Sequence, residues 1–464
     1  SLVTEPQKCL RIARLNLKAA QKAKQATAYA AALDYLRIIP EWIEPKLLWQ
    51  LDYPFAFAFH KELAEVEYLS GHFETSESLM KDMQPYLQST LDKVDIYHLL
   101  IIQKTLLGHY QEAIELGQQA LQLLGSGLPL DNTTEFLQHE MPLLKQRLIA
   151  ISLSDLLNAP HVVDPEKQAI FKILASIYAS CYLAGSELHP AIGLMLTSLS
   201  LTYGHTPESC FGYALYGYLL CNKFGEYALG YEFGQLSLQL AEKLQSSMQF
   251  CKSSVIMLSY IYHWSKPIQY LPALFTTAYE AGLAGGELEY AGYCVHEKVQ
   301  RMFYQGIIPL PKVQQEALPL LQFAYNTKNQ MAIDILNSIL RLVANLQGDT
   351  LDECNFDANA IHEAQFEESC QQANSIHPLC IYHILKAQAF YLYGYFKQAL
   401  DNLAWAKKSL IFISNHYTTA LFNWYDSLTH LALYPTASLK DQQAYLQQVI
   451  QNQQQMQRWQ ASCP

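Results

Sequence analysis

Apolar residues along the chain recur every three or four positions, the spacing that places side chains on one face of an α-helix. The pattern is clearest over 113–124 and 399–413. Strand signals are nearly absent, because the sequence has no Asn-Gly hairpin dipeptide and no sustained alternation of polar and apolar residues. The pattern predicts an all-α chain.

One short motif recurs along this helical pattern. A glycine is followed two positions later by an aromatic residue or leucine, and five positions later by a small residue. The copies span 71–76, 108–113, 225–230, 286–291 and 394–399. Glycine can end a helix in the left-handed conformation, and the small residue lets the next helix approach closely.

Tetratricopeptide repeats join antiparallel helices through turns of this kind. Because the copies are unevenly spaced, we predict a degenerate tetratricopeptide-like superhelix of antiparallel helix pairs, an α-solenoid. The residues expected to build its turns are Gly71, Phe73, Gly108, Tyr110, Ala113, Gly225, Tyr227, Gly286, Ala291, Gly394, Phe396 and Ala399.

Polar breaks divide the helical pattern into three parts. The clearer break is 347–359, and a second lies around 157–165. They predict N-terminal repeats over 1–158, aromatic-rich central repeats over 159–346 and C-terminal repeats over 347–464. Asp164 and Thr206 each precede a proline, which predicts two helix starts with these residues as caps.

Composition narrows the function classes. Half of the 464 residues are hydrophobic, 16% are charged and the net charge is −11. This balance excludes a disordered chain and argues against nucleic acid, which requires clustered Lys and Arg. The segment 172–223 is unusually apolar, but prolines and glycines divide it into short helices. We therefore expect no membrane insertion. Ten scattered cysteines without a CxxC pair predict reduced, buried thiols in a cytoplasmic protein.

Catalytic and metal-binding motifs fail in this sequence. It contains no phosphate-binding loop, no GxGxxG and no GxSxG. Three His-Glu pairs, at His139, His296 and His362, lack the second histidine that a zinc-protease helix needs. At His139 a proline also follows too soon for the phosphoacceptor helix of a histidine kinase. We expect no catalytic residue, no cofactor and no metal site.

Aromatic residues are the remaining unusual feature, with 31 tyrosines in the chain. Most of them fit helix packing. The alternative is a concave groove that grips a peptide or small ligand. Its candidate residues are Tyr203, Tyr213, Tyr216, Tyr231, His263 and Trp264.

Several central strings carry a resemblance to a known family. They are LSLTYGHTPES at 199–209, GYALYG at 212–217, GYEFGQLSL at 230–238 and LEYAGY at 288–293. They resemble the helical region of large multidomain bacterial signalling proteins. In that family, serine/threonine-kinase-like and P-loop ATPase domains precede the region. A GAF domain and a histidine kinase or diguanylate cyclase follow it.

The resemblance implies a non-catalytic regulatory module cut from a longer signalling polypeptide. Its partners would be a protein or peptide, neighbouring domains of the same chain, or a small molecule. Two alternatives stay open: a free-standing scaffold or effector that binds a partner protein in its concave groove, and an unrecognised all-α enzyme.

Overall fold

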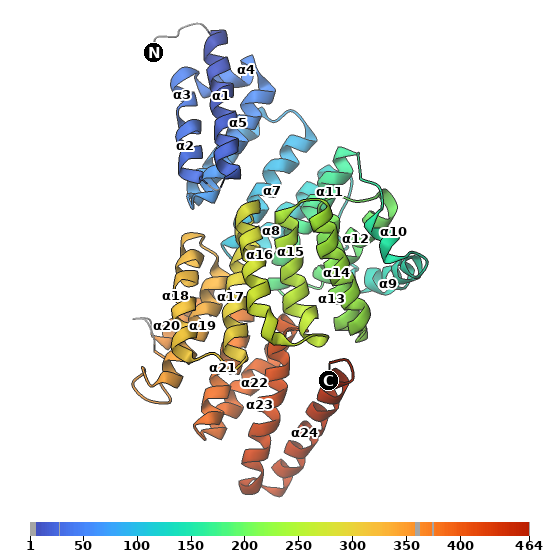
Figure 1. Cartoon of the computed structure of the whole chain (residues 1–464), viewed down its shortest axis with the longest axis vertical. Helices are drawn as coiled ribbons and strands as arrows, with labels where there is room; N and C mark the ends of the chain where they lie inside the picture. Colours follow the sequence, from blue (N-terminus) through green and yellow to red (C-terminus); the bar gives the residue numbers. More distant parts are fainter. Residues whose placement is uncertain (1–5, 27, 358–361, 374, 464) are drawn as a thin grey trace.

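The fold is described from a computed structural model, which covers residues 6–26, 28–357, 362–373 and 375–463. Within these ranges every regular element is a helix, and one isolated β-bridge joins His161 to His205. The all-α prediction is confirmed. The helices follow one another along an elongated molecule, from N-terminal helices at one end to C-terminal helices at the other (Figure 1).

The N-terminal part is built from short and medium helices. α1 and α2 pack together, as do α5 and α6, and α7 and α8. The bounds are α1 (Pro6–Gln25), α2 (Tyr29–Arg37), α3 (Ile39–Trp42), α4 (Pro45–Leu51), α5 (Tyr53–Leu69), α6 (Phe73–Met83), the 3₁₀ turn η1 (Gln84–Tyr86), α7 (Thr90–Leu106), α8 (Tyr110–Leu123), α9 (Thr133–Ile149) and α10 (Leu153–Leu157).

The central part contains the most deeply buried helices. Consecutive helices again pack on one another, and α11 also packs on α7 and α8. The bounds are α11 (Pro165–Leu183), α12 (Leu188–Tyr203), α13 (Glu208–Leu219), the π-turn η2 (Leu220–Phe224), α14 (Tyr227–Lys243), α15 (Ser247–Ile256), the π-turn η3 (Met257–Ile261), the 3₁₀ turns η4 (Tyr262–Trp264) and η5 (Ile268–Tyr270), α16 (Leu271–Gly285), α17 (Leu288–Tyr304), α18 (Leu310–Asn326) and α19 (Gln330–Gln347).

The C-terminal helices extend the stack and then turn back. The bounds are α20 (Glu363–Gln372), α21 (Ile376–Leu392), α22 (Phe396–Ser409), the 3₁₀ turn η6 (Leu410–Ile413), α23 (Tyr417–Leu433), the 3₁₀ turn η7 (Tyr434–Thr436) and α24 (Leu439–Gln460). The end of α24 points back toward the central helices (Figure 1), where Trp459 stacks on Trp264 with ring centroids 5.0 Å apart.

All five motif copies form the turn between two consecutive helices that pack on each other. Each motif glycine has a positive φ, from 66° at Gly225 to 83° at Gly71 and Gly394. In four of them the residue after the glycine donates its N–H to a carbonyl five residues back, as in a Schellman cap. The aromatic residue or leucine then begins the next helix, as Phe73 begins α6 and Tyr110 begins α8.

The small residue of the motif allows close packing, as expected. Ala113, Ala291 and Ala399 are fully buried. At Gly230 a Cβ atom would lie 2.4 Å from Sγ of Cys221, so any larger side chain would push α14 away from the helix before it.

Of the two predicted helix caps, the structure confirms Asp164 and not Thr206. Asp164 caps α11 by accepting the backbone N–H groups of Glu166 and Lys167. The prediction for Thr206 was wrong. α13 begins at Glu208, and Ser209 instead accepts the N–H of Thr206.

The apolar core has two large parts. One joins buried residues from Cys9 to Leu99, and the other joins buried residues from Val94 to Phe422. The second core continues without interruption across residues 158 and 346, so the predicted three-part division does not follow the packing. This second core lies in the middle of the molecule and includes residues of the helices from α11 to α19 and of α21.

Two helices end in π-turns, α13 in η2 and α15 in η3. In a π-turn each hydrogen bond spans one residue more than in an α-helix. η3 carries Ser259 and Tyr260 into the interior, at the place where the helices of the second core meet.

Candidate functional site

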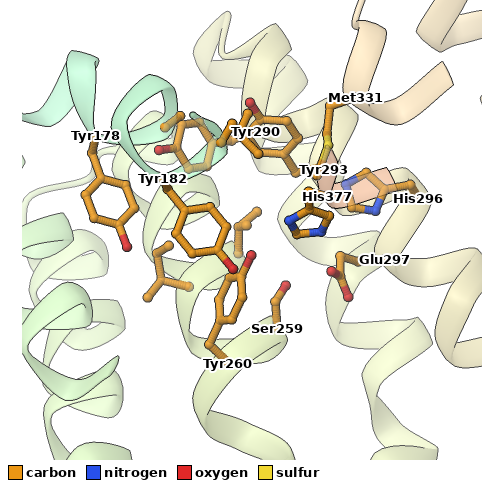
Figure 2. A pocket seen from close by; sticks show the side chains of 14 residues that line it. Tyr178, Tyr182, Ser259, Tyr260, Tyr290, Tyr293, His296, Glu297, Met331 and His377 are labelled. Atoms are coloured by element: carbon orange, nitrogen blue, oxygen red, sulfur yellow. The ribbon is translucent and has the colours of Figure 1, made fainter. Parts of the chain in front are cut away.

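A cavity of about 40 Å³ lies inside the second core (Figure 2). Five segments supply its walls: α11, α15 with η3, α17, α19 and α21. The first contributing residue, Tyr178, and the last, His377, are far apart in the sequence, so only the stacking of the helices brings them together.

One wall of the cavity is aromatic. Five tyrosines line it: Tyr178, Tyr182, Tyr260, Tyr290 and Tyr293. The rings of Tyr182 and Tyr260 meet edge-to-face with centroids 5.5 Å apart, and their hydroxyls point toward one another in Figure 2. Burial raises the pKa of all five phenols above the usual value, so they are neutral hydroxyl groups at neutral pH.

One corner of the cavity, beside the tyrosine rings, is polar. Ser259, His296, Glu297 and His377 meet there, and each is less than 6% exposed. Several polar atoms in this corner and beside it have no hydrogen-bond partner of normal geometry among the described residues. These are Ser259 Oγ, Tyr290 Oη at the edge of the corner, His296 Nε2 and both ring nitrogens of His377. Buried polar groups are nearly always paired in folded proteins, so this concentration is unusual.

Glu297 belongs to a buried ion pair behind this corner. Its carboxylate lies 2.8 Å from Nη2 of Arg301, one helical turn further along α17, and 2.7 Å from Nε2 of His416. Burial alone would raise the pKa of Glu297, but Arg301 and His416 outweigh it and hold that pKa well below its usual range. The guanidinium of Arg301 also lies 5.5 Å from the ring of Tyr417.

The histidines around the cavity are uncharged. Burial lowers the pKa of His296 to about 4, with Glu297 opposing the shift only in part. Burial also lowers the pKa of His377 well below its usual value, helped by His416 and His296 and opposed in part by Glu297. The pKa of His416 is lowered by burial too, although Glu297 favours its charged form. Glu297 and Arg301 therefore carry opposite charges beside the polar corner, and they compensate each other.

Hydrogen bonds fix two of the imidazole tautomers. The backbone N–H of Thr418 donates to Nδ1 of His416, so its Nε2–H donates to Glu297. The amide of Gln300 donates to Nδ1 of His296, which leaves the proton of that ring on Nε2. His296 thus carries an unpaired N–H donor in the cavity wall.

Sequence reasoning missed this site. His296 entered only as part of a failed zinc motif, and Glu297 and Arg301 were not singled out. A signal for the site lay in the sequence of α17. In this helix polar and apolar residues are both buried. A helix buried all round must pair its polar groups internally.

The predicted aromatic groove is not formed by the residues proposed for it. Tyr213, Tyr216, His263 and Trp264 are at most 5% exposed and pack in the core. This prediction was wrong for these four, because helical periodicity cannot distinguish a groove face from a core face.

Tyr203 and Tyr231 lie nearer the surface than those four. Tyr203 is exposed beside Lys167, and Tyr231 is half-buried against Tyr262. Neither lines the cavity.

The other His-Glu pairs lie at the surface. His139 contacts Glu140 on the exposed side of α9, and His362 contacts Asp357. Within the described ranges, no group of three or more His, Cys, Asp or Glu side chains is placed to hold a metal ion. Over the same residues, no helix combines the length and apolarity that a membrane crossing requires.

Comparison with known proteins gives one signalling relative. No protein-family model matches the chain. The chain is similar to the hybrid signal transduction histidine kinase G of Dictyostelium discoideum, with 20% identity over 373 residues. The aligned part covers 74% of this chain and 11% of the kinase, so the chain spans about one tenth of its relative's length. The relative is not bacterial, unlike the family suggested by the central strings.

Proposed function

We propose that the chain is a non-catalytic, tetratricopeptide-like helical-repeat module within a larger signal-transduction ATPase or kinase. In this role it mediates protein–protein or ligand-sensing interactions in the cytoplasm. The observation that carries the proposal is the similarity to a signal transduction histidine kinase, which extends over 74% of this chain but only 11% of the kinase. The matching region is a small part of that kinase, which supports a module within a larger protein.

The helix turns support the repeat half of the proposal. Five glycine-centred turns join helices that pack on each other, as a tetratricopeptide-like α-solenoid requires. In such a stack each unit contacts mainly its neighbours, so small rotations between units add up to bending. A module of this kind can pass a change at one end to a domain attached at the other.

The electrostatics of the cavity support the non-catalytic half. Glu297, the carboxyl that lines the cavity, is held by Arg301 and His416, and its pKa is lowered away from the neutral range that general acid–base catalysis uses. Partners of the module would be a protein or peptide, adjoining domains of the same polypeptide, or a small molecule.

One observation favours the alternative of a free-standing scaffold or effector. α23 and α24 form the last hairpin, and it leaves large apolar side chains in solvent, among them Trp424 at 50% and Ile450 at 57% exposure. Exposed apolar side chains on neighbouring helices are common where a partner protein binds.

The native polypeptide separates these two hypotheses. An antibody against this chain is used to immunoprecipitate the protein from its source, and the product is sized and sequenced by mass spectrometry. The expected product is far larger than 52.8 kDa and yields peptides of a kinase or ATPase domain. A product that runs with the recombinant 52.8 kDa chain and yields no such peptides would overturn the signalling module and leave the scaffold.

A further inference from the structure

We propose that the cavity between α11, α15, α17, α19 and α21 is a binding site for a compact, neutral molecule with a hydroxyl or amide head group. The proposal deepens the ligand-sensing part of the proposed function. Its test is read on this chain alone, so its failure would leave the relation to a larger signalling protein untouched.

Unpaired polar atoms are the first reason. Ser259 Oγ, Tyr290 Oη and His296 Nε2 all border the same small space and lack partners among the described residues. The backbone of Phe412 engages one ring nitrogen of His377, which leaves its other nitrogen without a partner. Each of these residues is at least nine-tenths buried. A ligand that bonds to them replaces the water that each lost on folding.

The hydrogen-bonding capacity of the corner defines the head group. His296 offers an N–H donor, because its Nδ1 already accepts from Gln300. A neutral His377 whose N–H faces the backbone carbonyl of Phe412 offers one bare nitrogen that accepts. A head group that complements both must accept and donate at once. Hydroxyl and primary amide groups do so, whereas carboxylates only accept and ammonium groups only donate.

Charge excludes an ionic ligand. The negative charge of Glu297 is compensated by Arg301 at 2.8 Å, and the surrounding imidazoles are neutral. An ion in the cavity would therefore be buried without a counter-charge, which is strongly unfavourable. A neutral molecule avoids this penalty.

Size and wall chemistry define the rest of the ligand. The cavity measures about 40 Å³, and one water needs about 10–15 Å³ by the same measure, so there is space for about three water-sized groups. The rest of the lining is apolar and aromatic, with Leu183, Val255 and Ile256 in addition to the tyrosines. A short alcohol or amide with about three or four non-hydrogen atoms fits both ends.

The test uses the full chain with acetamide and ethanol as neutral probes. Acetate and methylammonium are their charged counterparts of similar size. Binding is followed by the change in melting temperature and by isothermal titration, with dissociation constants on the order of millimolar expected for so few atoms. The expected result is a concentration-dependent rise in melting temperature with a neutral probe and none with the charged pair.

Variants tie the binding to the cavity. Ser259→Ala removes one unpaired hydroxyl, and His377→Leu removes the imidazole whose bare nitrogen accepts. Ser237→Ala is the matched control, because Ser237 is also fully buried but donates to Gly234 O and does not line the cavity. We expect acetamide affinity to fall at least tenfold in H377L and severalfold in S259A, and to stay unchanged in S237A.

Three outcomes would overturn the proposal. Charged probes could bind as well as neutral ones, or H377L and S259A could bind acetamide like the parent chain. A crystal grown with acetamide could also show water alone in the cavity while no probe shifts the melting temperature. If H377L does not fold, S259A decides, because it removes a single oxygen atom.

Discussion

Breaking the buried pair of Glu297 and Arg301 tests the electrostatics of the core. The side chains are 3% and 0% exposed, so neither can turn out to solvent when its partner is removed. Glu297→Gln keeps an acceptor for His416 but leaves the guanidinium buried and uncompensated. Arg301→Met leaves the carboxylate without its cation.

The magnitudes follow from burial. Removing one partner of a buried ion pair costs about 3–5 kcal/mol, so the two single changes together cost about 6 kcal/mol or more. The double variant buries no charge, and the amide that replaces the carboxylate still accepts the hydrogen bond from His416. It should cost no more than about 3 kcal/mol, since replacing a whole buried pair is often nearly neutral. The coupling between the two positions is then at least about 3 kcal/mol.

Urea unfolding, followed by circular dichroism, measures the free energy of unfolding of the parent chain, the two single variants and the double variant. The dependence of this free energy on urea concentration is expected to be the same in all four. The matched control is Lys81→Met. Lys81 pairs with Glu77 at the same spacing and 2.9 Å, but its side chain is 71% exposed. That change should cost less than about 1 kcal/mol. Additive effects of the two core changes would refute the reasoning, as would a core single variant no less stable than the control.

Three further predictions concern other parts of the chain. Burial lowers the pKa of His205 from 6.5 to about 4, so the unfolded chain binds more protons between these values and stability falls as pH drops through them. In His205→Asn this contribution is absent, and its stability deficit relative to the parent should shrink by about 3 kcal/mol between pH 7 and pH 4; an unchanged deficit would contradict the shift. Gly204→Ala should cost at least about 2 kcal/mol in urea unfolding, because φ is +102° and the new Cβ would lie 2.3 Å from a backbone oxygen. Gly286→Ala, whose Cβ meets nothing, should cost about 1 kcal/mol, and equal costs would count against the clash. Finally, a thiol reagent should label Cys354 and Cys463 fast and the eight buried cysteines only after unfolding; rapid labelling of more than two thiols in the native chain would show that the core is not closed as described.

The repeat turns could be predicted from sequence because their requirements are local. A glycine such as Gly108 must adopt positive φ wherever a helix ends in this way, and the next aromatic residue, Tyr110, is only two positions away. Asp164 before Pro165 is equally local, and it caps α11 as expected. These features can be recognised in the sequence without any knowledge of the tertiary structure.

The cavity could not be predicted in the same way. His377 reaches it only because α21 packs on α19 and α19 on α17. Polar residues such as Glu297 and Arg301 are usually solvated, and nothing local to them indicates that they are buried. The groove prediction failed at Tyr213 and Trp264 for the opposite reason, since aromatic residues are consistent with both a core and a binding face.

The π-turn η3 makes the cavity depend on the number of residues as well as on their identity. A π-turn is what a single inserted residue leaves in an α-helix, and each residue turns the helix by about 100°. Removing Met257 or Leu258, which precede Ser259 and Tyr260, would rotate the following side chains by that angle relative to α15. Ser259 and Tyr260 could then not both keep their places in the wall. A deletion of one codon could thus keep nearly every wall residue in the gene and still abolish the cavity.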